Sequence, residues 1–187
     1  MRSLAAPFAA LALALLAGCA SNPPAARPAQ ADLAAFTLDG RIAVKYDGQR
    51  SSGSFHWLHD AASDDITMLA PLGLTIAHIQ RDAHGASLEA SGKHYAAPDS
   101  AELMQRALGW ALPLDGLPYW VMALPAPGIP ASMERNDSGQ VSLLRQDGWE
   151  IRYTAYAATT ANSLPLRLTL QRDNLEIRLL IDEWKTN

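Results

Sequence analysis

The C-terminal stretch from Leu175 to Ile181 alternates strictly between apolar and polar side chains, and this pattern constrains the fold most. Leu175, Ile177, Leu179 and Ile181 recur with a period of two. Successive side chains of a β-strand point to opposite faces, so this period predicts a strand with one buried and one solvated face. Strands of this kind are typical of antiparallel sheets, because parallel sheets usually bury both faces.

The same alternation recurs along most of the chain after residue 33. It runs from Phe36 to Tyr46, where Asp47-Gly48 signals a turn, and resumes at Gly53. The other strand-like segments are 66–69, 74–79, 86–90, 141–146, 149–153 and 166–170. Strands this closely spaced, with short turns, predict an antiparallel meander of about nine to eleven strands.

The middle of the chain breaks this rhythm and carries helical signals. Pro98-Asp99-Ser100-Ala101-Glu102 supplies a capping residue with a Glu three positions later, followed by an apolar stripe at helical spacing. A second short helix is expected within 114–124, with Pro118 near its first turn, and a Pro-rich loop over 125–136. We therefore expect a mainly β fold with inserted α-helices: a curved single sheet with the helices against its inner face.

The first 19 residues carry the pattern of a bacterial lipoprotein signal. An apolar run from Leu4 to Ala17 follows Arg2 and ends in Gly18-Cys19. Small residues let a peptidase close on the backbone, and Cys19, the chain's single cysteine, supplies a thiol that can carry lipid. We predict a signal peptide over 1–18, with N-acyl and S-diacylglycerol groups on Cys19. The alternative is an ordinary signal peptide or a membrane anchor, for which the run is short.

Residues 19–32, rich in Pro and Ala, are expected to form a flexible tether to a body over 33–187. Ala20 follows the cysteine, where an Asp resembles the inner-membrane retention signal of bacterial lipoproteins, so its absence favours the periplasmic face of the outer membrane. The chain has 15 Lys and Arg against 19 Asp and Glu. That balance argues against binding nucleic acid through its phosphates.

Motifs for nucleotide binding and for common catalytic chemistry are absent from the sequence: it has no G-x-S-x-G elbow, P-loop or dinucleotide glycine motif. His56 and His59 are three residues apart and point to opposite faces of a strand, which disfavours a metal site. Asp64-Asp65 is interpreted as part of a solvated loop. We expect no cofactor and no enzymatic activity. A Ser/His/Asp set assembled in space would instead make a lipid-anchored hydrolase, and a purely structural lipoprotein is the other alternative.

A series of short motifs, in order from Leu33 to Trp184, resembles the LolB family of outer-membrane lipoprotein receptors. The motifs are Phe36-x-Leu38-x-Gly40-Arg41-Ile42-Ala43-Val44, Phe55-x-Trp57, Pro71-Leu72-Gly73, Leu112-Pro113-Leu114 with Leu117 and Trp120, Gln146-x-Gly148-Trp149-x-Ile151-x-Tyr153, Pro165-x-Arg167-Leu168 and Ile177-Arg178-Leu179-x-Ile181-x-x-Trp184. One departure is Ala123, where a glycine is more usual in the family. If this position needs a positive φ, alanine there costs about 1 kcal/mol.

The resemblance implies an incomplete antiparallel β-barrel whose apolar concave face is covered by helices. It also implies a task, which is to accept client lipoproteins from the periplasmic carrier LolA and place them in the inner leaflet of the outer membrane. Such transfer needs no nucleotide, in agreement with the missing motifs. We expect a monomer that binds no nucleic acid.

The main candidate site is the turn Pro71-Leu72-Gly73. A turn normally shows polar residues to water, and an exposed Leu72 resembles the protruding apolar residue with which LolB-type proteins engage the membrane; Leu74 either assists or belongs to the core. The residues expected to line an acyl-chain cavity, each with a core role as its alternative, are Ile42, Val44, Phe55, Trp57, Met68, Ile76, Leu88, Leu103, Met104, Leu108, Trp120, Val121, Trp149, Ile151, Leu168, Ile177 and Leu179. Arg41 is expected to bond helix carbonyls or to meet the acidic side of a partner.

Overall fold

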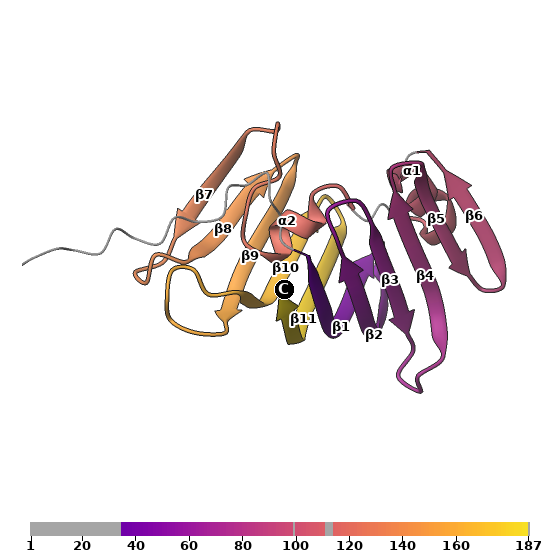
Figure 1. The fold of residues 1–187 in the computed structure, drawn as a ribbon, viewed down its shortest axis with the longest axis horizontal. Helices are drawn as coiled ribbons and strands as arrows, with labels where there is room; N and C mark the ends of the chain where they lie inside the picture. Colours follow the sequence, from indigo (N-terminus) through magenta and orange to yellow (C-terminus); the bar gives the residue numbers. More distant parts are fainter. Residues whose placement is uncertain (1–34, 99, 111–113, 187) are drawn as a thin grey trace, which may run out of the picture.

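A computed structural model describes residues 35–98, 100–110 and 114–186, apart from the side chains of residues 101 and 108. Eleven strands form one antiparallel sheet in the order β6-β5-β4-β3-β2-β1-β11-β10-β9-β8-β7 (Figure 1). The strands are β1 (Phe36–Tyr46), β2 (Gln49–His59), β3 (Asp64–Leu69), β4 (Thr75–Asp82), β5 (Gly85–Ala90), β6 (Lys93–Ala97), β7 (Ala131–Arg135), β8 (Val141–Gln146), β9 (Trp149–Tyr156), β10 (Pro165–Arg172) and β11 (Leu175–Thr186). The predicted fold class and strand number are confirmed.

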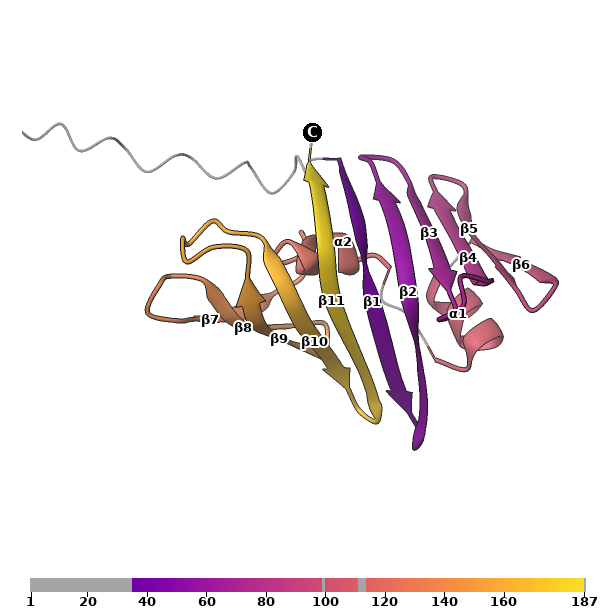
Figure 2. The ribbon, with the colours of Figure 1, turned by 90° about the horizontal axis from the view of Figure 1, so that it is seen from below.

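The first and last strands of the body meet at the centre of the sheet. β1 pairs with β11 along its whole length, with Ile42 opposite Leu179, so the two halves of the meander join there. The order ends at β6 and β7, which leaves the curved sheet open (Figure 2). The segment between these two edge strands carries both helices and covers the inner face.

The pairing of β1 with β11 shifts between Asp39 and Gly40, where Asp182 of β11 is the extra residue of a bulge. A Cβ at Gly40 would lie 2.4 Å from the carbonyl oxygen of Leu180 and 2.9 Å from the ring of Phe55. Both distances are shorter than any real Cβ contact, so the close passage of these strands requires glycine at this position.

Helix α1 (Ser100–Leu108) packs on β5 and β6 through Leu103 and Met104, which are fully buried. The helix begins where it was predicted, although its expected cap, Asp99, lies outside the described residues. Its exposed face carries a Glu102–Arg106 ion pair at i, i+4. After the helix, Gly109 takes a left-handed conformation, φ +79°, that is typical of a helix end.

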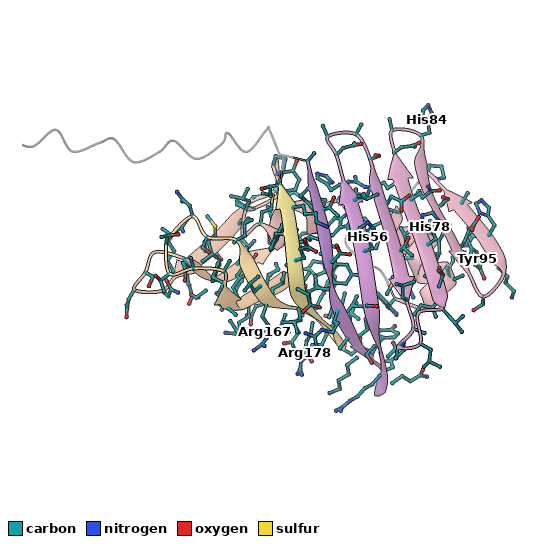
Figure 3. The ribbon with its side chains drawn as sticks, turned by 60° about the horizontal axis from the view of Figure 1, so that its bottom comes forward. His56, His78, His84, Tyr95, Arg167 and Arg178 are labelled. Atoms are coloured by element: carbon teal, nitrogen blue, oxygen red, sulfur yellow. The ribbon has the colours of Figure 1, made fainter. Side chains whose placement is uncertain are left out.

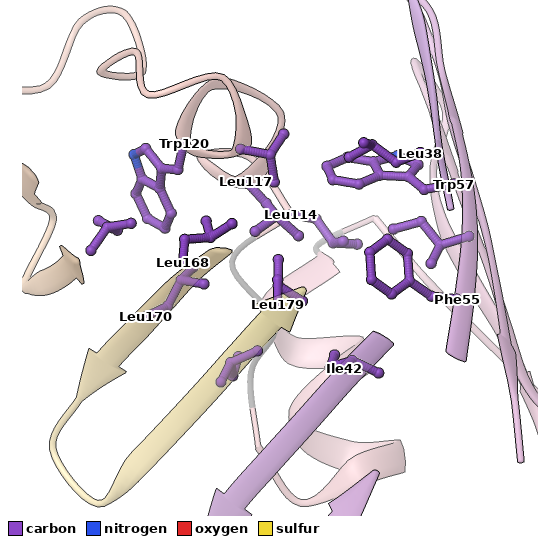
Figure 4. Packing of buried hydrophobic residues seen from close by; sticks show 14 of the residues in the cluster. Leu38, Ile42, Phe55, Trp57, Leu114, Leu117, Trp120, Leu168, Leu170 and Leu179 are labelled. Carbon is purple, nitrogen blue, oxygen red and sulfur yellow. The ribbon is translucent and has the colours of Figure 1, made fainter. Parts of the chain in front are cut away.

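Helix α2 (Leu117–Val121) lies over the middle of the sheet. Pro118 occupies its first turn, as expected, where a missing N–H costs nothing. In Figure 4, Leu114 and Leu117 lie between Trp120 on one side and Trp57 and Phe55 on the other. Trp120 also lies 6.1 Å, between ring centroids, from Trp149 of β9, so this short helix connects the apolar faces of the two halves of the sheet.

Ala123 follows α2 with φ 57°. The position at which the LolB family more usually has glycine therefore does take a positive φ in this chain. The amide of Ala123 donates to the carbonyl of Trp120, and the amide of Leu124 donates to that of Tyr119, each at 3.0 Å. These two bonds form a Schellman motif, whose left-handed position is usually glycine. Alanine at this position carries a conformational penalty.

Two parts of the fold differ from expectation. The Pro-rich segment 125–136 is not all loop, because Ala131–Arg135 forms β7, and Lys93–Ala97 adds β6 beyond the strands recognised from alternation. Both are edge strands, and every residue of β7 is exposed. A strand with no buried face has no apolar period to detect. Among the described residues, no helix is long and apolar enough to cross a bilayer.

Candidate functional site

The loop between β3 and β4 presents Leu72 at its tip. The amide of Gly73 donates to the carbonyl of Ala70 at 2.8 Å, which closes a β-turn with Pro71 and Leu72 at its centre. The amide of Ala70 in turn donates to the carbonyl of Leu74 at 2.8 Å, and Gly73 has φ +80°. This is a three-residue hairpin loop with its last residue in the left-handed region, which glycine adopts without strain.

The loop concentrates apolar side chains in solvent. Leu72 is 91% exposed, Leu74 is 69% exposed and Ile76 is 43% exposed. They are three of the six large hydrophobic residues exposed in the described part of the chain. Soluble proteins seldom gather exposed apolar side chains without a binding role, so this hairpin tip is the first candidate for an interaction site.

The exposure of Ile76 corrects the expectation that it lines the cavity. In β4, Ala77 and Ile79 are the buried members of the alternation. The pairing of β3 with β4 shifts between Met68 and Leu69, so Met68 faces Ala77 while Leu69 faces Thr75. Ile76 is therefore the extra residue of a bulge, and the alternation with Ala77 and Ile79 turns its side chain outward.

The other cavity candidates lie on the inner face of the sheet or on the helices that cover it. Met68 is half-buried against the apolar cluster, and the side chain of Leu108 lies outside the described residues, as does Cys19. The remaining candidates, all buried in one cluster, are Ile42, Val44, Phe55, Trp57, Leu88, Leu103, Met104, Trp120, Val121, Trp149, Ile151, Leu168, Ile177 and Leu179. The inner face is therefore apolar along most of the sheet.

The cavity residues predicted from the sequence omit several apolar residues that also lie on the inner face. They are Leu38, Ile66, Ile79, Leu114, Leu117, Leu144, Leu170 and Ile181, all of them buried in this cluster. Leu38 and Ile181 lie within recognised alternating runs, so the period of two could have placed them. Leu114 and Leu117 precede or enter a helix of five residues, which is too short to show a period of its own.

Two side chains from β8 and β9 hold α2 on the inner face. The buried amide of Gln146 accepts from Trp120 Nε1 at 2.8 Å and from the amide of Ala126 at 2.7 Å, and it donates to the carbonyls of Ala126 and Ile129. Tyr153 Oη donates to the carbonyl of Trp120 at 2.8 Å. Burial raises the pKa of Tyr153 well above its usual value, so the phenol stays a donor.

A buried ionic cluster lies at one end of the inner face. Asp64 accepts hydrogen bonds from Trp57 Nε1 at 2.8 Å and from His59 Nδ1 at 2.7 Å, and it is paired with Arg81 on β4. Arg81 also reaches Asp115, at 3.3 Å, in the segment before α2. The interpretation of Asp64-Asp65 as a solvated loop is wrong, since both residues belong to β3 and Asp64 is buried.

The charge of Asp64 is stabilised by its partners. Burial by itself raises the pKa of this carboxyl, but the hydrogen bond from His59, the positive charge and hydrogen bond of Arg81 and the bond from Trp57 together hold the pKa below its ordinary value. Asp64 is therefore ionised at neutral pH and ties β2, β3 and β4 together.

Among the described residues, no serine hydroxyl is hydrogen-bonded to His59 of this cluster. His59 Nε2 is buried and has no hydrogen-bond partner in the described part of the chain, and the nearby Ser63 hydroxyl donates to Asp60 instead.

His56 lies on the opposite face of β2, as predicted, where its Nδ1 lies 2.6 Å from the carboxylate of Asp39. Residues 35–98, 100–110 and 114–186 contain no group of three or more His, Cys, Asp or Glu side chains arranged to hold a metal ion.

Arg41 bonds no helix carbonyl in the described part of the chain, and its expected contact with an acidic partner stays a prediction. Its guanidinium donates two hydrogen bonds to Asp182 on the neighbouring strand β11, at 2.8 and 3.1 Å. Both side chains are exposed on the outer face of the sheet, so this pair adds little stability.

Comparisons with known proteins agree with this geometry. The sequence profile described as "Outer membrane lipoprotein LolB" matches residues 34–184. The chain is 39% identical to the outer-membrane lipoprotein LolB of Thiobacillus denitrificans over 189 residues, which cover 100% of this chain and 99% of the relative. It is 36% identical to the LolB of Azoarcus sp. over 98% of this chain and 96% of the relative.

A solved structure shares the fold at low sequence identity. The crystal structure of a DUF1329 family protein from Desulfovibrio piger superimposes with a TM-score of 0.53 and 6% identity, and covers 84% of this chain and 88% of that one. At this identity the likeness concerns the fold alone.

Proposed function

This chain belongs to the LolB family of outer-membrane lipoproteins, and from that premise we propose that it accepts lipoproteins from a LolA-like periplasmic carrier and inserts them into the outer membrane. The cargo's acyl chains would be held against the apolar inner face of the sheet. No bond of the cargo would be made or broken, and no nucleotide would be consumed. The anchor of this protein would be lipid on Cys19.

The energetics of the cargo explain the need for an apolar receptor. Burying a methylene group is worth roughly 0.8 kcal/mol, so three acyl chains of about fifteen methylenes each cost roughly 35 kcal/mol to hold in water. Transfer must therefore pass from one apolar surface to the next. The inner face offers such a surface, with Trp57, Phe55 and Leu168 among its buried side chains.

The observation that carries the proposal is the exposure of Leu72 at the tip of a hairpin loop. An apolar side chain in this position gains nothing from the fold, but it gains free energy on entering the acyl region of a bilayer. We infer that the loop perturbs the membrane when the cargo is released. Leu74 and Ile76 extend the same apolar surface.

A transfer assay tests the proposal. The mature lipidated protein, reconstituted in liposomes, is mixed with a LolA-like carrier loaded with a tagged lipoprotein, and tagged protein in the membrane is measured. We expect Leu72→Glu to retain acceptance of the cargo and to abolish its insertion. Met133→Glu, which changes the charge equally at an exposed apolar residue of β7, is the matched control and should insert cargo normally. Insertion by Leu72→Glu at the wild-type rate would contradict the proposal.

Photo-crosslinking tests the acyl-binding role of the inner face. A photoreactive residue at Ile151, which is buried on β9, should crosslink to the cargo's acyl chains during transfer. The same residue at Leu58, exposed on the outer side of β2, is the control and should not. Equal labelling from both positions would remove the support for an acyl site inside the sheet.

A further inference from the structure

The outer face of the sheet carries basic side chains where β2, β1, β11 and β10 run side by side. Strand register places the outward-facing residues in three rows across these strands. The rows are Ser54, Arg41, Leu180 and Arg167; then Ser52, Ala43, Arg178 and Thr169; then Arg50, Lys45, Glu176 and Gln171. We call the surface formed by Arg41, Lys45, Arg50, Arg167 and Arg178 the basic face.

The basic face concentrates positive charge on a chain whose net charge is negative. It holds five of the 15 Lys and Arg residues of a chain whose net charge is −4. Two carboxylates lie against it, Asp182 on Arg41 and Glu176 on Arg178. In the described part of the chain, the side chains of Arg167, Lys45 and Arg50 make no hydrogen bond or ion pair, so positive charge remains in excess.

The fold gains little from this arrangement, since the ion pairs of Arg41 and Arg178 are exposed. Lys45 lies directly opposite Arg50 in the β1–β2 ladder, and like charges at facing positions destabilise a sheet. Figure 3 labels Arg167 and Arg178, which project from neighbouring strands β10 and β11 on the same side of the sheet. A group of cations that repel one another and have few partners points to an anionic ligand outside the chain.

The basic face is continuous with the loop that carries Leu72. A groove of about 620 Å³ on this face is lined by Arg41, Arg167 and Arg178, and Pro71 of the loop forms part of its wall. Its floor is made of small or apolar side chains, including Ala43, Ser52 and Leu180. Exposed leucines beside arginines make the combination of groups that binds the interface of a bilayer, where apolar side chains enter and cations meet phosphates.

We propose that the basic face is a membrane-docking surface, whose arginines bind the phosphates of acidic phospholipid head groups and so orient the Leu72 loop toward the bilayer. Guanidinium groups bind phosphate oxygens through paired, charge-assisted hydrogen bonds, which suits Arg167 and Arg178. This inference rests on the proposed role of Leu72 and adds the lipid class that the loop would meet.

A fluorescence experiment on the lipidated mature protein tests the docking surface. Cys19 is the only native cysteine, so a cysteine introduced at Leu74 can be labelled with an environment-sensitive dye once the native thiol carries lipid. The protein is reconstituted in vesicles of phosphatidylcholine, with or without a minor fraction of phosphatidylglycerol. The dye signal reports the fraction of loops in the apolar region.

We expect more loop insertion with phosphatidylglycerol, and loss of this gain at high salt, because exposed charges are screened. Each basic residue near an acidic surface raises binding about fivefold, so Arg167→Glu with Arg178→Glu should lower the insertion equilibrium about 25-fold or more. Lys93→Glu with Lys185→Glu makes the same charge change at exposed positions outside the basic face and should have little effect. Arg167→Gln with Arg178→Gln should give an intermediate value, which separates lost binding from added repulsion.

The outcomes separate this inference from the function on which it rests. Equal insertion of the wild type in neutral and acidic vesicles would overturn the docking surface and leave the role of Leu72 intact. A charge-reversed variant that inserts normally but no longer accepts cargo would also overturn it, since the basic face would then bind the carrier. Insertion that survives Leu72→Glu would instead contradict the proposed function.

Discussion

The indole nitrogen of Trp120 donates a 2.8 Å hydrogen bond to the amide oxygen of Gln146, which joins α2 to strand β8 across the inner face of the sheet. Both residues are buried, and the same amide satisfies three backbone groups of the segment after the helix. One side chain therefore fixes the position of the central part of the helical cover.

Gln146→Leu should destabilise the protein strongly. Leucine fills a similar volume but leaves the indole N–H of Trp120 and the backbone groups of Ala126 and Ile129 without partners. An unsatisfied buried polar group costs about 1–3 kcal/mol, so we expect a loss of about 3 kcal/mol in the free energy of unfolding, measured by urea denaturation. Gln171→Leu, at an exposed position of β10, is the control and should change it little. Equal effects would show that the network contributes nothing.

Ala123→Gly should stabilise the protein. Glycine adopts φ 57° without the penalty that alanine pays at the end of α2, although it also adds freedom to the unfolded chain. We expect a net gain of about 0.5–1 kcal/mol, or roughly 1–4 °C in melting temperature. Ala126→Gly, at a nearby buried alanine outside the left-handed region, should lower the melting temperature. A lower melting temperature for both variants would mean that the methyl group of Ala123 matters more than its backbone conformation.

Asp64→Asn should destabilise the protein most at neutral pH. The pKa of Asp64 is lower in the folded chain than in the unfolded one, so its contribution is complete above the ordinary carboxyl pKa and is lost as the pH falls through the folded value. Removing the charge leaves Arg81 without its buried partner, at a cost on the order of 2 kcal/mol.

The measurement for Asp64 is the difference in unfolding free energy between the variant and the wild type as a function of pH. This difference should be largest near pH 7 and should narrow as the pH falls from the ordinary carboxyl pKa of about 4, where the unfolded chain takes up a proton, toward the lower pKa of the folded chain. Asp137→Asn, at an exposed turn position, is the surface control. A difference that stays constant down to pH 2 would contradict the ionic role of Asp64.

Leu72→Ser should leave stability unchanged while it impairs function. The side chain is almost fully exposed, so the unfolding free energy should stay within about 0.5 kcal/mol of the wild type. Leu88→Ala, at a fully buried leucine on β5, should cost about 2–5 kcal/mol. Marked destabilisation by Leu72→Ser would mean that the loop packs on the body in solution.

The sequence predicts those parts of the fold in which burial and strand period coincide. The strands β1, β2 and β11 have one buried face, and their alternation is plain in the residues. The edge strand Ala131–Arg135 is exposed on both faces and carries no such pattern. Leu72 was recognisable as a site because an apolar residue is unusual in a turn.

The sequence could not predict features that depend on strand register. Asp64 and Arg81 are separated by 17 residues and meet because β3 pairs with β4, so the acidic pair resembles a solvated loop when it is read alone. Ile76 faces outward because Ala77 and Ile79 take the buried face of β4, and the sequence does not separate the two faces because apolar residues lie on both. The basic face likewise brings together Arg41, Arg167 and Arg178 from distant parts of the chain.

The register of the first strand also determines how far the body can turn on its anchor. Phe36 pairs with His59, whereas the Leu72 loop leaves the sheet at Leu69, which pairs with Ser54. The offset of five residues along β2 between these pairs corresponds to about 17 Å of strand. The 16 residues from Cys19 to Ala34 can span up to about 55 Å when fully extended. With lipid on Cys19, a tether of this length would let the Leu72 end of the body reach the bilayer that holds the anchor. The anchor would then limit only the distance of the body from the membrane, and the surface of the body would determine its orientation.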